Sequence, residues 1–203
     1  MLHDIEMLLP TGSFNLLVGP NGSGKTTLLR LASTFALPTQ GRIHWGQADG
    51  TETLDARKAR PRIGYAGHTP LLYDELTTYE HLEFALRIRG HTTAGARDGA
   101  ETWLRTFELH HRYDERAETL SRGLRQRLAL AQAFAPRPDF LLLDEPGSNL
   151  DAHGLEVLVE TLRAARRTAT ILIATHEPDP FRPLADRVLE VKDGNVQVWG
   201  EKT

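Results

Sequence analysis

The chain has 203 residues, of which 40% are hydrophobic and 25% charged, as is ordinary for one globular domain with or without a subdomain. Its formal net charge of −3 gives no electrostatic reason to expect a nucleic-acid partner, and the absence of cysteine excludes disulfides, thiolate metal sites and a cysteine nucleophile. No membrane span of roughly 20 apolar residues and no signal peptide is predicted, so any membrane attachment should be through a partner.

A glycine-rich loop follows the first predicted strands. Ile5 to Leu9 and Phe14 to Val18 are expected to form two strands joined by a turn. The second strand leads into a segment that fits G-x-x-x-x-G-K-[ST] in full, namely Gly19-Pro20-Asn21-Gly22-Ser23-Gly24-Lys25-Thr26. A helix that starts at Thr27 is predicted to follow and to end near Pro38.

This loop predicts a site for a nucleoside triphosphate. Between a strand and a helix, its glycines let backbone N–H groups surround a phosphate chain. Lys25 adds positive charge for the β- and γ-phosphates, and the hydroxyl of Thr26 can ligate Mg²⁺. A chance match of a glycine-rich turn is the alternative, and the strand–loop–helix context argues against it.

The next segments are less regular. Residues 41–46 are predicted to form a short strand, and residues 47–61 a polar loop or short helix. Residues 62–67 have the pattern of a buried strand that ends at a turn.

A run of helices is predicted next. Thr77 and Glu80 form a candidate capping box for a helix that ends before Gly90. Residues 91–99 are expected to be a loop, and residues 100–109 and 122–135 two further helices. Consecutive helices between strands indicate a helical insert in an alternating α/β chain.

The last part alternates more regularly. Residues 140–143 and 170–174 are continuous apolar strands of the kind buried in a parallel sheet, with a core-facing helix over residues 155–162 between them. Residues 188–191 and 196–199 are predicted to form a hairpin through Asp193-Gly194.

An acidic pair follows the first of these buried strands. An acid at the carboxyl end of a parallel strand lies beside the phosphate-binding loop, where Mg²⁺ would sit. Asp144 is therefore a candidate ligand of Mg²⁺, and Glu145 a candidate base that orients and deprotonates water. Alone, such a pair could merely cap the next helix.

The chain resembles the ABC-type ATPases over nearly its whole length. The segments that carry the resemblance, in the order and spacing of that family, are the glycine loop, Leu120-Ser121-Arg122-Gly123-Leu124, Leu141-Leu142-Leu143-Asp144-Glu145-Pro146, Ser148-Asn149-Leu150-Asp151 and Ala174-Thr175-His176. The resemblance implies an α/β fold of the P-loop NTPase (RecA-like) class, with a mainly parallel sheet, a helical subdomain and a truncated N-terminal antiparallel β part. It implies one domain over residues 1–203, with 1–75 and 136–203 in the core and 76–135 in the helical subdomain.

The resemblance also implies a composite active site. Two subunits pack head to tail, and ATP lies between the P-loop of one and the signature segment, residues 120–124, of the other. Ser121 and Gly123 would contact the γ-phosphate held by the partner, and Asp151 would lie in the segment that crosses the interface. A histidine after a strand could instead be a satisfied loop residue, but the family's pattern makes His176 the γ-phosphate clamp.

The site residues implied in this way fall into three groups. The catalytic residues are Glu145, His176 and Lys25. The Mg²⁺ ligands are Thr26 and Asp144, with His68 as a further candidate. The residues that bind ATP with Mg²⁺ are Gly19, Pro20, Asn21, Gly22, Ser23, Gly24, Lys25, Thr26, Thr27, His68, Ser121, Gly123, Asp144 and Asp151.

Two segments depart from the family's usual pattern. The signature has Arg122 and Leu124 where glycine and glutamine are commoner, but it keeps Ser121 and Gly123. His68 stands where the family usually has a glutamine; its imidazole could approach Mg²⁺ or act as a local switch without metal contact. Gly67-His68, Glu75-Leu76-Thr77 and the signature together resemble the ATPase subunit of the haem-exporter, or cytochrome c maturation, group.

A third departure concerns the start of the chain. Leu2 to Val18 matches the strand pair directly before the P-loop, so the family's first strand and its adenine-stacking aromatic residue are absent. Of the aromatic side chains before the loop, His3 and Phe14, the latter is expected to pack in the core. Either the true start lies upstream, or base stacking is weak or supplied differently, at a cost of ~1–2 kcal/mol of ATP affinity.

The sequence thus predicts a cytoplasmic ABC ATPase subunit, paired as a homodimer or with a second ATPase subunit, on the cytoplasmic face of the cell membrane. It would drive integral membrane subunits in export, with haem for cytochrome c biogenesis as the specific hypothesis. Residues 68–77 would carry the nucleotide state to them, with Leu71-Leu72-Tyr73 near a coupling helix unless these residues pack inside the helical insert. The alternatives are an exporter of lipid, drug or polysaccharide, a soluble ABC protein, and a degenerate regulatory domain.

Overall fold

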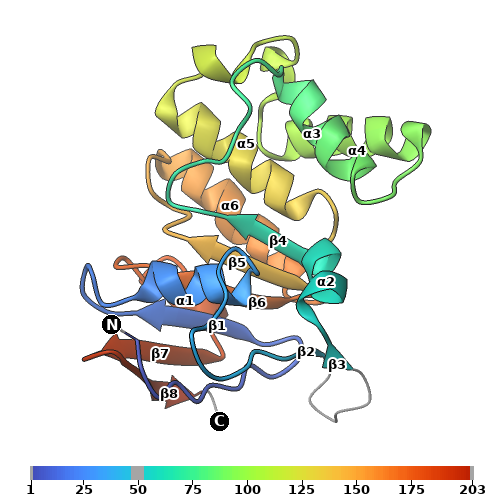
Figure 1. Ribbon diagram of the computed structural model, residues 1–203. Helices are drawn as coiled ribbons and strands as arrows, with labels where there is room; N and C mark the ends of the chain where they lie inside the picture. Colours follow the sequence, from blue (N-terminus) through green and yellow to red (C-terminus); the bar gives the residue numbers. More distant parts are fainter. Residues whose placement is uncertain (1, 47–52, 202–203) are drawn as a thin grey trace.

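A six-stranded sheet forms the centre of the computed structural model, which describes residues 2–46 and 53–201 (Figure 1). The strand order is β4–β5–β6–β1–β7–β8, and every neighbouring pair is parallel except the β7–β8 hairpin. The strands are β1 (Phe14–Val18), β4 (Ile63–Ala66), β5 (Phe140–Asp144), β6 (Thr170–Ala174), β7 (Arg187–Lys192) and β8 (Asn195–Glu201). The predicted α/β fold with a mainly parallel sheet is confirmed.

Both faces of the sheet are covered by helices, which explains why β5 and β6 are apolar without alternation. On one face, Leu142 and Leu172 belong to a core cluster with Leu28 and Leu29 of α1 (Lys25–Ala32). On the other face, the neighbouring strand residues pack with α5 (Arg122–Phe134) and α6 (Ala152–Ala165). Phe14 has no exposed surface, so its predicted place in the core is confirmed.

The hairpin after β6 also agrees with the sequence. Its turn residues Asp193 and Gly194 have φ angles of 49° and 81°, which suits the tight turn of a two-residue hairpin. A short 3₁₀ turn, η4 (Arg182–Leu184), precedes β7.

The predicted strand over residues 5–9 is wrong. Residues 2–10 contain no strand, although Ile5, Met7 and Leu9 all pack against the core cluster that includes α1. The alternation therefore reports burial of one side of an extended segment and not a ladder of hydrogen bonds.

The segment after α1 is only partly as expected. The antiparallel pair of β2 (Trp45–Gly46) and β3 (Thr53–Leu54) uses just the end of the predicted strand over 41–46. A short helix is present, α2 (Ala56–Ala59), followed by η1 (Arg60–Arg62), and Asp55 caps α2. Residues 47–52 of the predicted loop lie outside the described residues.

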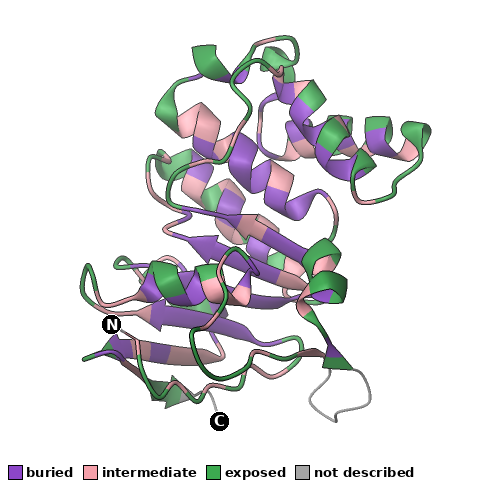
Figure 2. Ribbon diagram, in the orientation of Figure 1, coloured by how far each residue is buried: buried purple, intermediate pink, exposed green. Residues whose placement is uncertain are grey.

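The consecutive helices form a separate layer beyond β4, in which Figure 2 shows α5 as largely buried. The predicted capping box is confirmed: Thr77 N–H donates to the Glu80 carboxylate at 2.8 Å, and the Thr77 hydroxyl accepts from Glu80 N–H. The elements between β4 and α5 are α3 (Thr78–Arg87), α4 (Thr93–Thr106), η2 (His110–Arg112) and η3 (Ala117–Thr119).

The loop predicted over residues 91–99 is largely helical instead. α4 begins at Thr93, and the Thr92 hydroxyl caps it by accepting from Gly95 N–H at 3.1 Å. Gly99 faces Leu86 of α3 so closely that a Cβ would lie 2.8 Å from the leucine side chain. Glycine here allows two helices to approach, a purpose that composition alone does not distinguish from flexibility.

Within residues 2–46 and 53–201, none of the helices combines the length and the apolar character needed to cross a bilayer.

Gly64→Ala tests the packing of β4 against α5. A Cβ at Gly64 would lie 2.2 Å from the Ala133 carbonyl oxygen, which is backbone and cannot rotate away. We expect the substitution to lower the free energy of unfolding by about 2 kcal/mol or more, measured by urea denaturation. Gly200→Ala is the matched control, because a Cβ there meets nothing within 4 Å. Equal unfolding midpoints for the two variants would contradict this packing.

Candidate functional site

The carboxyl ends of β1, β5 and β6 meet at one edge of the sheet and form a pocket of about 620 Å³. This is the position in which open parallel sheets bind ligands. Of the residues singled out in the sequence, the pocket is lined by Asn21, Gly22, Gly24, Lys25, Thr26, Thr27, His68, Asp144, Glu145 and His176.

The loop between β1 and α1 is shaped by glycines in the left-handed region. Gly19, Gly22 and Gly24 have φ angles of 148°, 78° and 109°, which strain any residue with a Cβ. Lys25 folds across the loop, and its ammonium donates to the carbonyl oxygens of Gly19 at 2.7 Å and Pro20 at 3.2 Å. A nearly buried positive charge therefore lies where α1 begins.

Thr26 and Asp144 are brought together from opposite halves of the chain. The Thr26 hydroxyl donates to the Asp144 carboxylate at 2.7 Å. Burial raises the pKa of Asp144 above its ordinary value; the hydrogen bond from Thr26 and the charges of His68 and Lys25 act in the opposite direction. A hydroxyl and a carboxylate at this distance are oxygen ligands of the type that Mg²⁺ prefers.

Glu145 is held by the residues that follow β6. Its carboxylate accepts from the Thr175 hydroxyl at 3.0 Å and from His176 N–H at 3.0 Å. The His176 ring nitrogen Nδ1 lies 2.9 Å from the same carboxylate, which raises the pKa of His176 through this hydrogen bond and the charge of Glu145. The backbone of Glu145 has a φ of 49°, an uncommon conformation for a residue other than glycine, and such outliers cluster at functional sites.

Six predicted site residues do not line this pocket: Gly19, Pro20 and Ser23 belong to the loop beside it, whereas Ser121, Gly123 and Asp151 lie elsewhere. Ser121 caps α5 by accepting from Leu124 N–H, and Asp151 caps α6 by accepting from Gly154 N–H at 2.8 Å. Gly123 packs on the segment before α6, where a Cβ would lie 2.7 Å from the Asn149 carbonyl oxygen. The signature segment and residues 148–151 therefore support each other on a surface separate from the P-loop pocket.

Some functional contacts were not assigned from the sequence. Thr175 lies in a segment that the family resemblance includes, but its bond to Glu145 depends on the turn after β6. Arg30 lines the pocket one helical turn after Thr26, a spacing that places both on one face of α1. Arg127 joins Glu108 at 2.7 Å and Asp151 at 2.8 Å, a pairing between distant segments that no local pattern reveals.

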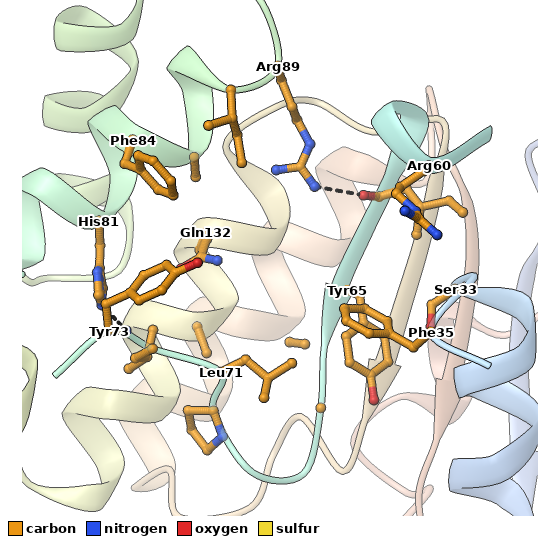
Figure 3. Close-up of a pocket in the computed structure, with 18 of the residues that line it drawn as sticks. Ser33, Phe35, Arg60, Tyr65, Leu71, Tyr73, His81, Phe84, Arg89 and Gln132 are labelled. Atoms are coloured by element: carbon orange, nitrogen blue, oxygen red, sulfur yellow. Dashed lines mark hydrogen bonds between the residues drawn. The ribbon is translucent and has the colours of Figure 1, made fainter. Parts of the chain in front are cut away.

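A second, larger hollow of about 770 Å³ lies between β4, the segment after it and helices α3 and α5 (Figure 3). We call it the groove. Its walls carry exposed apolar side chains, with exposed fractions of 60% for Leu71, 58% for Tyr73 and 43% for Phe84. Leu72, in contrast, packs against the main core cluster. The alternative that residues 71–73 simply pack inside the helical insert is therefore wrong for Leu71 and Tyr73.

His81 fixes the wall of the groove formed by residues 70–73. Its Nε2 accepts a hydrogen bond from Tyr73 N–H at 3.1 Å (Figure 3), so the ring proton is on Nδ1. Among the described residues, Nδ1 has no partner, and His81 is 2% exposed. Burial lowers the pKa of His81 from 6.5 to about 4.

Comparison with known proteins identifies the kind of chain. A protein-family model described as ABC transporter matches residues 2–148. A probable anion import ATP-binding protein of Haloferax volcanii is 36% identical over 210 residues, covering 96% of this chain and 73% of that protein. The lipoprotein-releasing system ATP-binding protein LolD of Desulfotalea psychrophila is 34% identical, covering 97% of this chain and 90% of that protein.

The fold is shared with solved structures. One of them, described as the dimeric, post-hydrolysis state of an ATP-binding cassette bound to ADP and Pi, has a TM-score of 0.87 and 27% sequence identity. The match covers 100% of this chain and 90% of that one.

His81 provides a test of the groove wall by pH. Because its pKa is lowered in the fold, its neutral form stabilises the protein fully above pH 6.5, and this contribution declines as the pH falls toward about 4. The contribution is on the order of 3 kcal/mol. NMR titration should show one histidine neutral at pH 5, and His81→Gln should remove that signal and flatten the decline in unfolding free energy. His91→Gln, at an exposed histidine, is the control; a His81 resonance that titrates near pH 6.5 would contradict the burial.

Proposed function

The chain belongs to the ABC transporter family and is an ATPase that uses ATP with Mg²⁺, and we propose the residue roles and the coupling by which it works. The observation that carries the proposal is the joint placement of Lys25, the Thr26–Asp144 pair and Glu145 around one pocket. The glycine loop and the oxygen ligands fit a triphosphate with Mg²⁺.

Each group in the pocket has a distinct part in hydrolysis. Lys25 and the N–H groups at the start of α1 stabilise negative charge on the phosphates. Thr26 and Asp144 would hold Mg²⁺, with His68 on the neighbouring wall as a further candidate. When bound, the ion would supply positive charge that offsets the negative charge of the phosphates.

Glu145 acts as the general base. Its carboxylate accepts hydrogen bonds from Thr175 and His176, which aim it into the pocket and orient it to take a proton from water. His176, half exposed beside it, is proposed to contact the γ-phosphate while it keeps Glu145 in place.

A second subunit is proposed to complete the site. Ser121 and Gly123 lie at the start of α5, outside the P-loop pocket, as a group that acts on a partner's nucleotide would. The resemblance to a cassette solved as a dimer supports this arrangement. Asp151 caps α6 and accepts from Arg127 within its own chain, so its part at the interface is to shape residues 148–151.

The groove is the proposed docking place for an integral membrane subunit. The residues that follow His68 in the chain form one wall of the groove, which presents Leu71, Tyr73 and Phe84 to the outside. Residues 68–77 would then link the γ-phosphate to the membrane subunit. Residues 1–75 and 136–203 are proposed to act as the core, and residues 76–135 as the helical subdomain, of one domain on the cytoplasmic face of the membrane.

The finer proposal is export of haem for cytochrome c biogenesis. It rests on Gly67-His68, Glu75-Leu76-Thr77 and the signature segment, which resemble the haem-exporter group. The relatives described above are named for anion import and for lipoprotein release, so transport in general has the broader support.

Glu145→Gln tests the base and the dimer together. We expect purified wild type to hydrolyse ATP and the variant to lose activity by roughly 100-fold or more, because a general base contributes this much. The variant should form a stable ATP-dependent dimer, followed by light scattering. Glu160→Gln, an exposed glutamate on α6, should keep both turnover and the monomer–dimer behaviour of the wild type. Unchanged turnover in Glu145→Gln would remove Glu145 from the role of base.

The haem proposal has its own test in the source organism. Deletion of the gene should abolish covalently bound haem in c-type cytochromes, measured by haem staining of membranes, because haem would no longer reach their site of assembly. Wild-type protein supplied from a plasmid should restore the staining, and Lys25→Ala should not. Normal c-type cytochromes in the deletion strain would show that another molecule is transported.

A further inference from the structure

Residues 67–77, here called the linking segment, run from the nucleotide pocket to the start of α3 and pass beside the residues that precede the signature. Gly67, His68 and Thr69 line the P-loop pocket, and Pro70 to Tyr73 line the groove. The far end of the segment is bonded to residues 115–118, which lead directly to Ser121. The backbone bonds are Glu118 N–H to Asp74 O at 3.2 Å and Ala117 N–H to Leu76 O at 2.9 Å; directly after the segment, Thr78 N–H donates to Glu115 O at 3.0 Å.

The guanidinium group of Arg125 joins α5 to both the linking segment and residues 115–118. Arg125 donates through Nη2 to the Asp74 carboxylate at 2.7 Å and through Nη1 to the Ala117 carbonyl oxygen at 2.7 Å. The side chain of Arg125 is 25% exposed, and its bond to Ala117 is partly shielded from water, whereas the Asp74 side chain is 56% exposed. Arginine suits this position because its planar fork offers donors in two directions at once, whereas a lysine ammonium is a point charge.

Arg125 is also placed to act on the signature. It lies one helical turn after Ser121, and its own N–H donates to the Ser121 carbonyl oxygen at 2.9 Å. Its side chain therefore fixes the first turn of α5 relative to both the linking segment and residues 115–118.

We propose that Arg125 is a positioning residue for ATP turnover: it holds Ser121 in register with the linking segment, so that the two move as one body. The inference rests on the proposed composite site, in which Ser121 acts on the nucleotide of the partner subunit. Arg125 touches no phosphate; its effect passes through Ser121. Loss of the Arg125 guanidinium would leave the P-loop pocket of the same chain intact and would impair ATP turnover in the pocket of the partner subunit.

Because the effect is expected on the partner's pocket, mixing two variants distinguishes a positioning role of Arg125 from a loss of folding. A homodimer of Arg125→Gln should turn over ATP roughly tenfold more slowly than wild type, in keeping with the loss of a charge-assisted hydrogen bond at the signature. Mixed with inactive Glu145→Gln, it should regain turnover well above the sum of the two homodimers. In the mixed dimer, one pocket combines the intact Glu145 of one chain with the intact signature of the other. Asp74→Ala, at the other end of the ion pair, should behave in the same way.

Two controls make each outcome decisive. Arg163→Gln removes an equally short ion pair, with Glu160 at 2.6 Å, that lies within α6 away from the linking segment, and it should keep wild-type turnover. Ser121→Ala mixed with Glu145→Gln tests the composite site itself. If that mixture recovers but the Arg125→Gln mixture does not, or if Arg125→Gln alone is as active as wild type, the inference is overturned and the proposed function stands. If the Ser121→Ala mixture also fails to recover, the composite site and the role of Arg125 fall together.

Discussion

The register of the parallel strands is the constraint on which the site depends. Ala174 at the end of β6 lies opposite Leu17 of β1 on one side and Asp144 of β5 on the other. The P-loop, the acidic pair and the Thr175–His176 turn therefore all begin at the same level of the sheet. A slip of one residue between β5 and β6 would move Asp144 to the opposite face, away from Thr26. The bond between Thr26 and Asp144, which joins residues 118 positions apart, is a direct consequence of that register.

Much of this arrangement could be predicted from the sequence because it depends on local patterns. The buried strands, the P-loop and the Thr77–Glu80 capping box each have a signature within a few residues, and each is present. The errors arose where one pattern serves two purposes. Alternating apolar residues in 5–9 bury one side of the segment without pairing in a sheet, and Gly99 allows α4 to pack on α3 where a loop was expected. The exact partners of Asp151 could not be predicted, since Arg127 reaches it only after the helical layer has folded against the core.

Helix α5 is the common support for the segments around the site. Three successive residues near its start point to three different parts of the chain: Arg125 to Asp74, Gln126 to the Pro146 carbonyl oxygen at 3.3 Å, and Arg127 to Asp151. Gln126 has no exposed surface, so its bond directly after the Asp144–Glu145 pair is shielded from water. Successive helical positions diverge by about 100°, which is why one turn can reach several segments. The helical layer is thus joined to the core by directional polar bonds as well as by apolar packing.

The contact of Gly123 with the Asn149 carbonyl oxygen bears on how such chains can be recombined. Because that space is closed by backbone, a signature segment transplanted from a relative would fit only if it carried glycine at the position of Gly123. Gly123 and Asn149 lie 26 positions apart in the sequence, so the signature segment considered alone does not reveal this constraint. A chimaera that places a larger residue there should pack poorly at the start of α5, whatever its affinity for nucleotide.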